Sequence, residues 1–269
     1  MIDQLKTLEE RYSWRDLVVD GHEWRWLDTA ADGPVAILLP GSVGDGAMFA
    51  PTLLSLGGRA RLIAVTYPAL SDPNRLAHGL AAVMDQIGLE AATIVGSSFA
   101  AYWAQFFALH YPQRVASLVI GNGFTDGSDL AANPLFDRSY VEGVEPAVLH
   151  GEWLARVRNT APSPLQRLQN VMLAERQSPA NLHSRFLGVV RSVPCASLDL
   201  PEASITVLDC DDDPLIPAAA RERLRSRYPA AHHVSLKKGG HYPHVLNAVE
   251  YEDVLWRSMH KDAAACAKS

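Results

Sequence analysis

Three short segments carry side chains that together could perform nucleophilic catalysis. Residues 96–100 (GSSFA) hold two serines between small residues, residues 209–217 (DCDDDPLIP) are rich in aspartate, and residues 238–244 (KGGHYPH) place a histidine after two glycines. A serine hydroxyl becomes a useful nucleophile when a histidine takes its proton and a carboxylate orients that histidine. The three segments occur in the order serine, aspartate, histidine, which is one of the known orders of such triads.

The serine segment is close to the pattern Gly-x-Ser-x-Gly, a sharp turn that presents a serine between a strand and a helix. Its last glycine is replaced by Ala100, and the central serine is Ser98, with Ser97 as the neighbouring alternative. Alanine is the smallest departure from glycine, so we expect the turn to form. The triad order selects Ser98 as the nucleophile, although the segment alone could be a tight serine turn.

The aspartate segment ends in Asp-x-x-x-Pro, a pattern that resembles the acid loop of α/β-hydrolases and selects Asp213. Asp211 and Asp212 remain alternatives as the residue that orients the histidine. An acidic loop could also be solvated, or could cap a helix that begins near Ala218.

The histidine segment predicts His241 as the general base, because a histidine in a glycine-bordered loop before a last helix can reach the serine. His232, His233 and His244 are interpreted as structural. His241 and His244 suggest no metal site, because no cysteine or carboxylate completes one at a suitable spacing. We therefore expect no metal, and a serine mechanism requires no cofactor.

A fourth segment, residues 39–44 (LPGSVG), could supply the oxyanion hole. It follows an apolar run, and its Pro40-Gly41 replaces the more usual His-Gly pair. The expected donors are the backbone N–H groups of Ser42, or of Val43, and of Phe99. A plain glycine turn after a strand would fit nearly as well.

Alternating apolar runs and helical patterns must position these segments. The runs at 35–39, 62–65, 93–95, 115–120 and 205–208 are typical of strands buried on both faces of a parallel sheet. Helical patterns cover 76–87, 100–110 and 251–260, and runs at 17–19 and 24–27 predict a leading antiparallel hairpin. The chain is thus predicted to be an α/β protein with a doubly wound, mostly parallel sheet, flanking helices and a frayed tail at 262–269.

The alternation fails between the strands near 120 and 205, where helical stretches are expected at 138–158, 164–175 and 180–190. We interpret residues 126–201 as a helical cap inserted into a core formed by 1–125 and 202–269. The candidate substrate-lining residues suggest an apolar ligand, although such aromatic residues often belong to a core. These candidates are Val43, Phe136, Tyr140, Trp153 and Phe186.

Composition favours a small-molecule partner. The 269 residues carry a formal net charge of −6 and no basic run, which argues against binding of nucleic acid or of a membrane surface. The N-terminal residues lack the apolar segment of a signal peptide or anchor. Cys195, Cys210 and Cys266 have no metal-type or redox-type spacing, so we expect a reducing, cytoplasmic location. Nothing in the sequence indicates an oligomeric state.

Beyond the α/β-hydrolase pattern, the sequence resembles the maspardin-like branch of that superfamily along most of its length, and least at 130–197. The similar segments are 12–14 (YSW), 39–41 (LPG), 64–68 (AVTYP), 95–98 (VGSS), 121–126 (GNGFTD) and 236–243 (LKKGGHYP). The resemblance implies the α/β-hydrolase fold. Animal maspardins are regarded as non-catalytic binding proteins, with asparagine at the position of His241 and no counterpart of Asp213.

Because this chain has both His241 and Asp213, the leading hypothesis is a serine hydrolase that acts on a small ester, thioester, lactone or amide-like carbonyl. A serine nucleophile disfavours dehalogenase and epoxide hydrolase chemistry. One alternative is a non-catalytic ligand-binding or adaptor protein. Another is a lyase or carbon–carbon bond hydrolase that uses the same triad.

Overall fold

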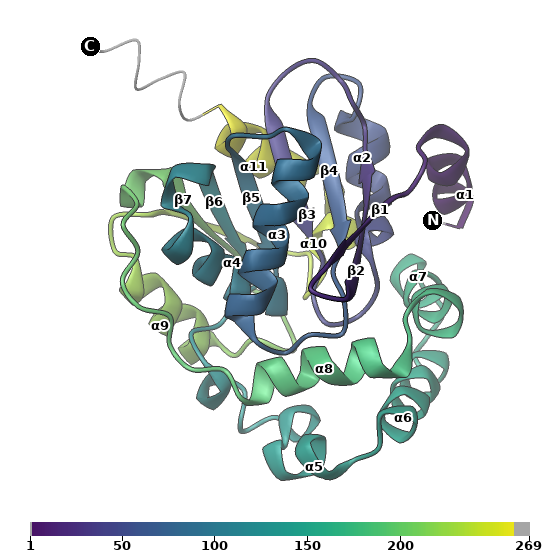
Figure 1. The fold of residues 1–269 in the computed structure, drawn as a ribbon. Coiled ribbons are helices and arrows are strands. Elements are labelled where there is room, and N and C mark those ends of the chain that lie inside the picture. The colour runs from purple at the N-terminus through teal and green to yellow at the C-terminus, as the bar shows by residue number, and fades with distance from the viewer. Residues whose placement is uncertain (1, 261–269) are drawn as a thin grey trace.

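The computed structural model describes residues 2–260, so the expected frayed tail and Cys266 lie outside the described residues. Its centre is an eight-stranded sheet with the spatial order β1-β2-β4-β3-β5-β6-β7-β8 (Figure 1). The strands are β1 (Arg15–Val19), β2 (His22–Asp28), β3 (Val35–Leu39), β4 (Arg61–Thr66), β5 (Ala92–Ser97), β6 (Val115–Gly121), β7 (Ile205–Cys210) and β8 (His232–Leu236).

The sheet is mostly parallel, as predicted. Strands β3 to β8 are parallel, whereas β1 and β2 form the expected antiparallel hairpin and β2 pairs antiparallel with β4. The hairpin turns at Asp20 and Gly21, which both have positive φ, 49° and 76°. The chain passes from β3 outward to β4 and then returns to the other side of β3 with β5. In open α/β sheets, ligands bind outside the carboxyl ends of the strands at such a reversal.

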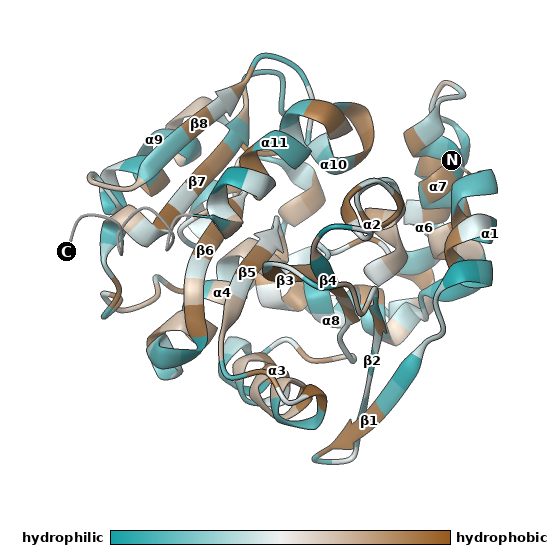
Figure 2. Cartoon of the chain, turned by 90° about the horizontal axis from the view of Figure 1, so that it is seen from above, coloured by the Kyte–Doolittle hydropathy of each residue, from teal (hydrophilic) through white to brown (hydrophobic). Residues whose placement is uncertain are grey.

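Helices cover both faces of the sheet, which explains why its central strands are apolar on both sides (Figure 2). One face carries α3 (Pro73–Ile87), α4 (Phe99–His110) and α9 (Ala218–Arg227). The opposite face carries α2 (Ala50–Leu56) and α11 (Ala248–Met259), together with α1 (Ile2–Arg11) and the short α10 (Pro243–Leu246). No helix within residues 2–260 has both the length and the apolar character needed to span a bilayer.

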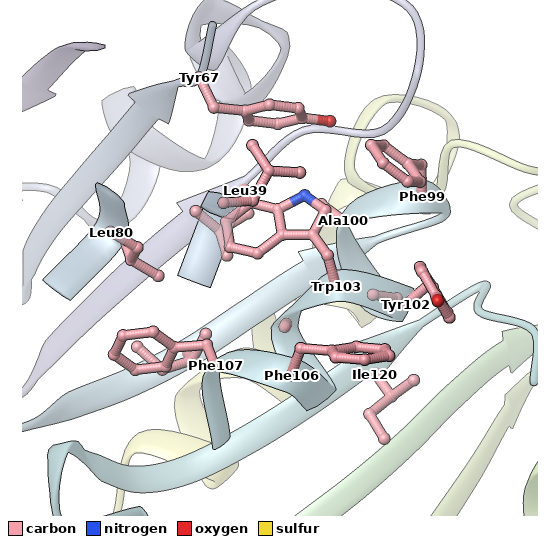
Figure 3. Close-up of a cluster of buried hydrophobic side chains, with 14 of the residues drawn as sticks. Leu39, Tyr67, Leu80, Phe99, Ala100, Tyr102, Trp103, Phe106, Phe107 and Ile120 are labelled. Atoms are coloured by element: carbon pink, nitrogen blue, oxygen red, sulfur yellow. The ribbon is translucent and has the colours of Figure 1, made fainter. Parts of the chain in front are cut away.

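Helix α4 is apolar around almost its whole circumference because it lies between the sheet and α3 (Figure 3). Trp103 and Phe107 are fully buried. The ring of Tyr67 meets Trp103 edge-on, with a centroid distance of 5.3 Å. Burying each such side chain contributes roughly 1.5–3 kcal/mol. This packing fixes the first turn of α4 and therefore the residue just before it, Ser98.

The segment between β6 and β7 is helical, and Figure 1 shows its helices gathered at one end of the sheet. They are α5 (Arg138–Gly143), α6 (Pro146–Arg158), α7 (Pro164–Val171) and α8 (Pro179–Val190). The prediction of one helical stretch over 138–158 was wrong, because Pro146 cannot continue α5 and begins a new helix. The stretch expected at 164–175 ends instead in a π-helical turn, Met172–Arg176.

Candidate active site

Ser98 occupies the sharp turn between β5 and α4. Its backbone angles, φ 54° and ψ −119°, lie in a strained region that residues other than glycine rarely adopt. The turn is held by the Ser98 N–H, which donates to Gly121 O at 2.8 Å. A Cβ on Gly96 would lie only 2.4 Å from Ala100 O, whereas Ala100 itself is accommodated with its side chain buried. Glycine is therefore required at 96 and not at 100.

His241 faces the Ser98 hydroxyl, with 2.8 Å between Nε2 and Oγ. The loop after β8 brings it there through Gly239 and Gly240, whose φ values of 147° and 54° suit glycine. The imidazole is only 6% exposed. Ser97, by contrast, belongs to β5 and is buried, so the structure places Ser98 and not Ser97 beside the imidazole.

Asp213 lies on the other side of the imidazole. Its Oδ2 is 2.9 Å and its Oδ1 3.2 Å from His241 Nδ1. Oδ1 also accepts the N–H groups of Leu215 and Ile216, which fix the carboxylate. An ionised carboxylate only accepts hydrogen bonds, so it favours the tautomer in which Nδ1 carries the proton and Nε2 is free to accept from Ser98.

The neighbouring aspartates have different partners. Asp211 forms an ion pair with Lys237 at 2.7 Å, and its side chain is 42% exposed. Asp212 accepts the N–H of Gly240 at 2.8 Å. Of the three aspartates that the sequence left open, only Asp213 contacts His241 among residues 2–260.

Asn122, which the sequence analysis missed, completes the support of Asp213. It directly follows β6 and has a φ of 47°, and its Nδ2 donates to Asp213 Oδ2 at 2.7 Å and to Gly240 O at 3.2 Å. Burial by itself raises the pKa of the Asp213 carboxyl. The attraction of His241 and hydrogen bonds from His241 and Asn122 outweigh burial and hold that pKa below its ordinary value.

The loop after β3 runs beside the serine. A Cβ on Gly41 would lie 3.0 Å from Ser98 Cβ and 3.7 Å from Ser98 Oγ. Gln177, from the helical segment, binds this loop, because its Oε1 accepts Gly44 N–H and its Nε2 donates to Ser42 O, both at 2.8 Å. Phe99 is the first residue of α4, and the first N–H groups of a helix have no partner within the helix.

The structure places the expected lining residues in two settings. Val43 is buried in the loop after β3. Phe136, Trp153 and Phe186 form one aromatic cluster within the helical segment, with centroid distances of 5.8 Å and 5.0 Å from Phe186. Tyr140 is 40% exposed and donates to Glu152. Trp153 and Tyr140 also border an outer hollow of about 440 Å³. A lining role for these residues stays a prediction.

Among the histidines of residues 2–260, only His241 is hydrogen-bonded to the Ser98 hydroxyl. His244 is buried against Phe49, with a centroid distance of 4.7 Å, and both of its ring nitrogens lack partners within the described chain. Burial, assisted by the nearby His241, lowers the pKa of His244 to about 3, so this ring is neutral at physiological pH. Residues 2–260 contain no cluster of three metal-ligating side chains.

Residues 36–254 match the family described as the alpha/beta hydrolase family. The chain therefore belongs to this family of hydrolases, and its fold is the α/β-hydrolase fold.

Several known proteins are similar to this chain along most of its length. Maspardin of Homo sapiens is 26% identical over 267 residues, which covers 89% of this chain and 83% of maspardin. The candidate carbamate hydrolase RutD of Pantoea ananatis is 24% identical over 254 residues, covering 87% and 91%. A thermophilic esterase from Thermogutta terrifontis superposes with a TM-score of 0.74 at 18% identity, covering 92% of this chain and 98% of the esterase. The similarity to maspardins is confirmed, and the match to the esterase is one of fold.

Proposed function

We propose that the protein is a serine hydrolase that cleaves a small, largely apolar ester, thioester, lactone or related carbonyl substrate. Ser98 Oγ attacks the carbonyl carbon while His241 Nε2 takes the hydroxyl proton. The carbonyl electron pair moves to oxygen, and the N–H groups of Ser42 and Phe99 stabilise the resulting oxyanion. Collapse of this intermediate expels the leaving group, which takes the proton from His241 and leaves an acyl-serine. Water, activated by the same histidine, then releases the acid.

The hydrogen-bonded chain from Asp213 through His241 to Ser98 is the observation that carries this proposal. A serine that only closed a turn would need neither an oriented histidine nor a buried carboxylate behind it. The backbone strain at Ser98, on the order of 1–3 kcal/mol, is of the kind that proteins retain at functional sites.

The same proposal assigns residues 126–201 as a cap over a core of residues 1–125 and 202–269. Two contacts support it. Gln177 binds the loop after β3. Gly188 of α8 packs so closely on Phe99 that an added Cβ would lie 2.4 Å from the ring. A cap in this position would select the acyl group, with Val43 and the cap aromatics providing apolar contacts. The buried free thiols of Cys195 and Cys210 are consistent with a cytoplasmic location.

Hydrolysis of a series of p-nitrophenyl esters, from acetate to octanoate, tests the proposal. We expect Ser98→Ala and His241→Ala to lower kcat/KM by a factor on the order of 10⁴ or more. Ser97→Ala is the matched control, since it removes the adjacent hydroxyl that does not face His241, and it should stay within a few-fold of the wild type. Wild-type rates in folded Ser98→Ala would refute the assignment.

Labelling with a fluorophosphonate separates the alternatives. A serine hydrolase should be labelled at Ser98. A ligand-binding protein without catalysis should fold and remain unlabelled. A carbon–carbon bond hydrolase should be labelled at Ser98 and yet not hydrolyse the p-nitrophenyl esters.

A further inference from the structure

Arg185, on α8, is a fully buried cation that Asp45 attracts without forming an ion pair with it. Its side chain is 0% exposed, and it takes part in none of the ion pairs within residues 2–260. Its partners are main-chain oxygens: Nη1 donates to Gly41 O at 2.8 Å and to Gly44 O at 2.7 Å, and Nη2 donates to Tyr67 O at 3.3 Å. The guanidinium carbon also lies 3.9 Å from the centroid of the Tyr67 ring.

Burying such a charge is unfavourable, and an apolar side chain of similar volume often stabilises a fold as well or better. Packing therefore gives no reason for an arginine at this position. The carbonyl acceptors do give a reason for an arginine, because two of its three acceptors, Gly41 O and Gly44 O, belong to the loop that passes beside Ser98.

The contact with Gly41 O fixes the direction of the next N–H. In a trans peptide the C=O of one residue and the N–H of the following residue point in opposite directions, and residues 2–260 contain no cis peptide. Arg185 and the hydroxyl of Tyr67, at 3.1 Å, hold Gly41 O on one side. The N–H of Ser42 must therefore face the other side of the loop.

Without these contacts this peptide could rotate, because glycine accepts many more backbone conformations than other residues. A rotated peptide would present the oxygen of Gly41 where the N–H of Ser42 should be, and a carbonyl oxygen repels an oxyanion. Gly41 cannot simply be replaced by a stiffer residue, since a Cβ would lie 3.0 Å from Ser98 Cβ.

We infer that Arg185 is a positioning residue that locks the Gly41–Ser42 peptide with its N–H directed at the reacting carbonyl oxygen. This inference rests on the proposed serine hydrolase function. Arg185 contacts no reacting atom, and its effect on the reaction passes through the loop that it holds.

The test compares Arg185→Met with Arg185→Lys, two unbranched side chains of similar length, only one of which can donate to both carbonyls. The measurements are the rate of phosphonylation by a fluorophosphonate, kcat and KM for p-nitrophenyl butanoate, and the melting temperature. For Arg185→Met we expect phosphonylation and kcat to fall roughly 10- to 100-fold with KM changed less than about threefold, and Arg185→Lys to recover part of the loss. Arg191→Met is the control, since Arg191 directly follows the same helix and pairs on the surface with Glu142.

The outcomes separate this inference from the function on which it rests. An unlabelled wild type contradicts the serine hydrolase. A labelled wild type with folded Arg185→Met labelled equally fast overturns only the role of Arg185, as does an equal loss in Arg191→Met. If no Arg185 variant folds, a crystal structure of the wild-type phosphonyl adduct decides. The inference requires that the phosphonyl oxygen accept a hydrogen bond from Ser42 N–H while Arg185 still donates to Gly41 O. Any other arrangement refutes it.

Discussion

Replacing Asn122 by glycine should destabilise the protein and leave Ser98, His241 and Asp213 hydrogen-bonded to one another. The change removes the Nδ2 donor that lies 2.7 Å from Asp213 Oδ2, and hydrogen bonds to charged groups contribute about 1.5–3 kcal/mol. Glycine tolerates the φ of 47°, so the backbone should keep its path. The N–H groups of Leu215 and Ile216 still hold Asp213, so we expect kcat to fall by no more than about tenfold, or 1.4 kcal/mol.

Urea unfolding at 25 °C measures the stability loss, and Asn122→Ala is the control. Alanine removes the same donor and adds the strain of a left-handed conformation, so it should be about 1–2 kcal/mol less stable than the glycine variant. The difference in free energy of unfolding between the wild type and Asn122→Gly measures the hydrogen bond. The difference between Asn122→Gly and Asn122→Ala measures the backbone strain. A glycine variant as stable as the wild type would show that the Asn122 bond does not contribute, and our reading of the Asp213 support would be wrong.

Three further predictions concern the aspartate beside His241, the sharp turn at residues 96–100 and a buried histidine. Asp213→Asn should lower kcat by about 10⁴-fold because it favours the wrong tautomer of the histidine, while Asp212→Asn should leave kcat within a few-fold, both measured on p-nitrophenyl butanoate. Ala100→Gly should be about 1 kcal/mol less stable by urea unfolding with no gain in kcat. Gly96→Ala should disrupt the sharp turn between β5 and α4, because its Cβ would meet Ala100 O. His244→Phe should remove an acid sensitivity of the wild type. The unfolded chain takes up a proton near pH 6.5 and the buried ring only near 3, so wild-type stability falls as the pH drops through this window, by about 1 kcal/mol over the first unit. The measurement is the free energy of unfolding in urea at several pH values. If it changes equally with pH in the wild type and in His244→Phe, the prediction is refuted.

The sequence predicted those parts of the structure that local pattern determines. A strand buried on both faces must be apolar along its whole length. Five such apolar runs were predicted to be strands and lie in strands, at 35–39, 62–65, 93–95, 115–120 and 205–208. Parallel strands bring their carboxyl ends to one edge, so the loops with Ser98, Asp213 and His241 were expected to meet. Their hydrogen bonds agree with that expectation.

Other features depend on contacts between distant segments, and no local pattern reports them. Asn122 lies in the segment 121–126 that resembles maspardins, but its contact with Asp213 joins residues 91 positions apart. Arg185 lies in an ordinary amphipathic helix, where an arginine would be expected to face solvent. The π-helical turn Met172–Arg176 follows α7 directly. The change from α-helical to π-helical hydrogen bonds does not alter the spacing of apolar residues in the sequence, so that spacing does not predict it.

The most direct test of the central claim is the mass of the peptide that carries a fluorophosphonate label. We predict one adduct per chain, located at Ser98, formed rapidly by the wild type, much more slowly by His241→Ala, and absent from Ser98→Ala. An adduct on another residue, or folded wild-type protein that acquires none, would contradict the assignment of Ser98 as an activated nucleophile.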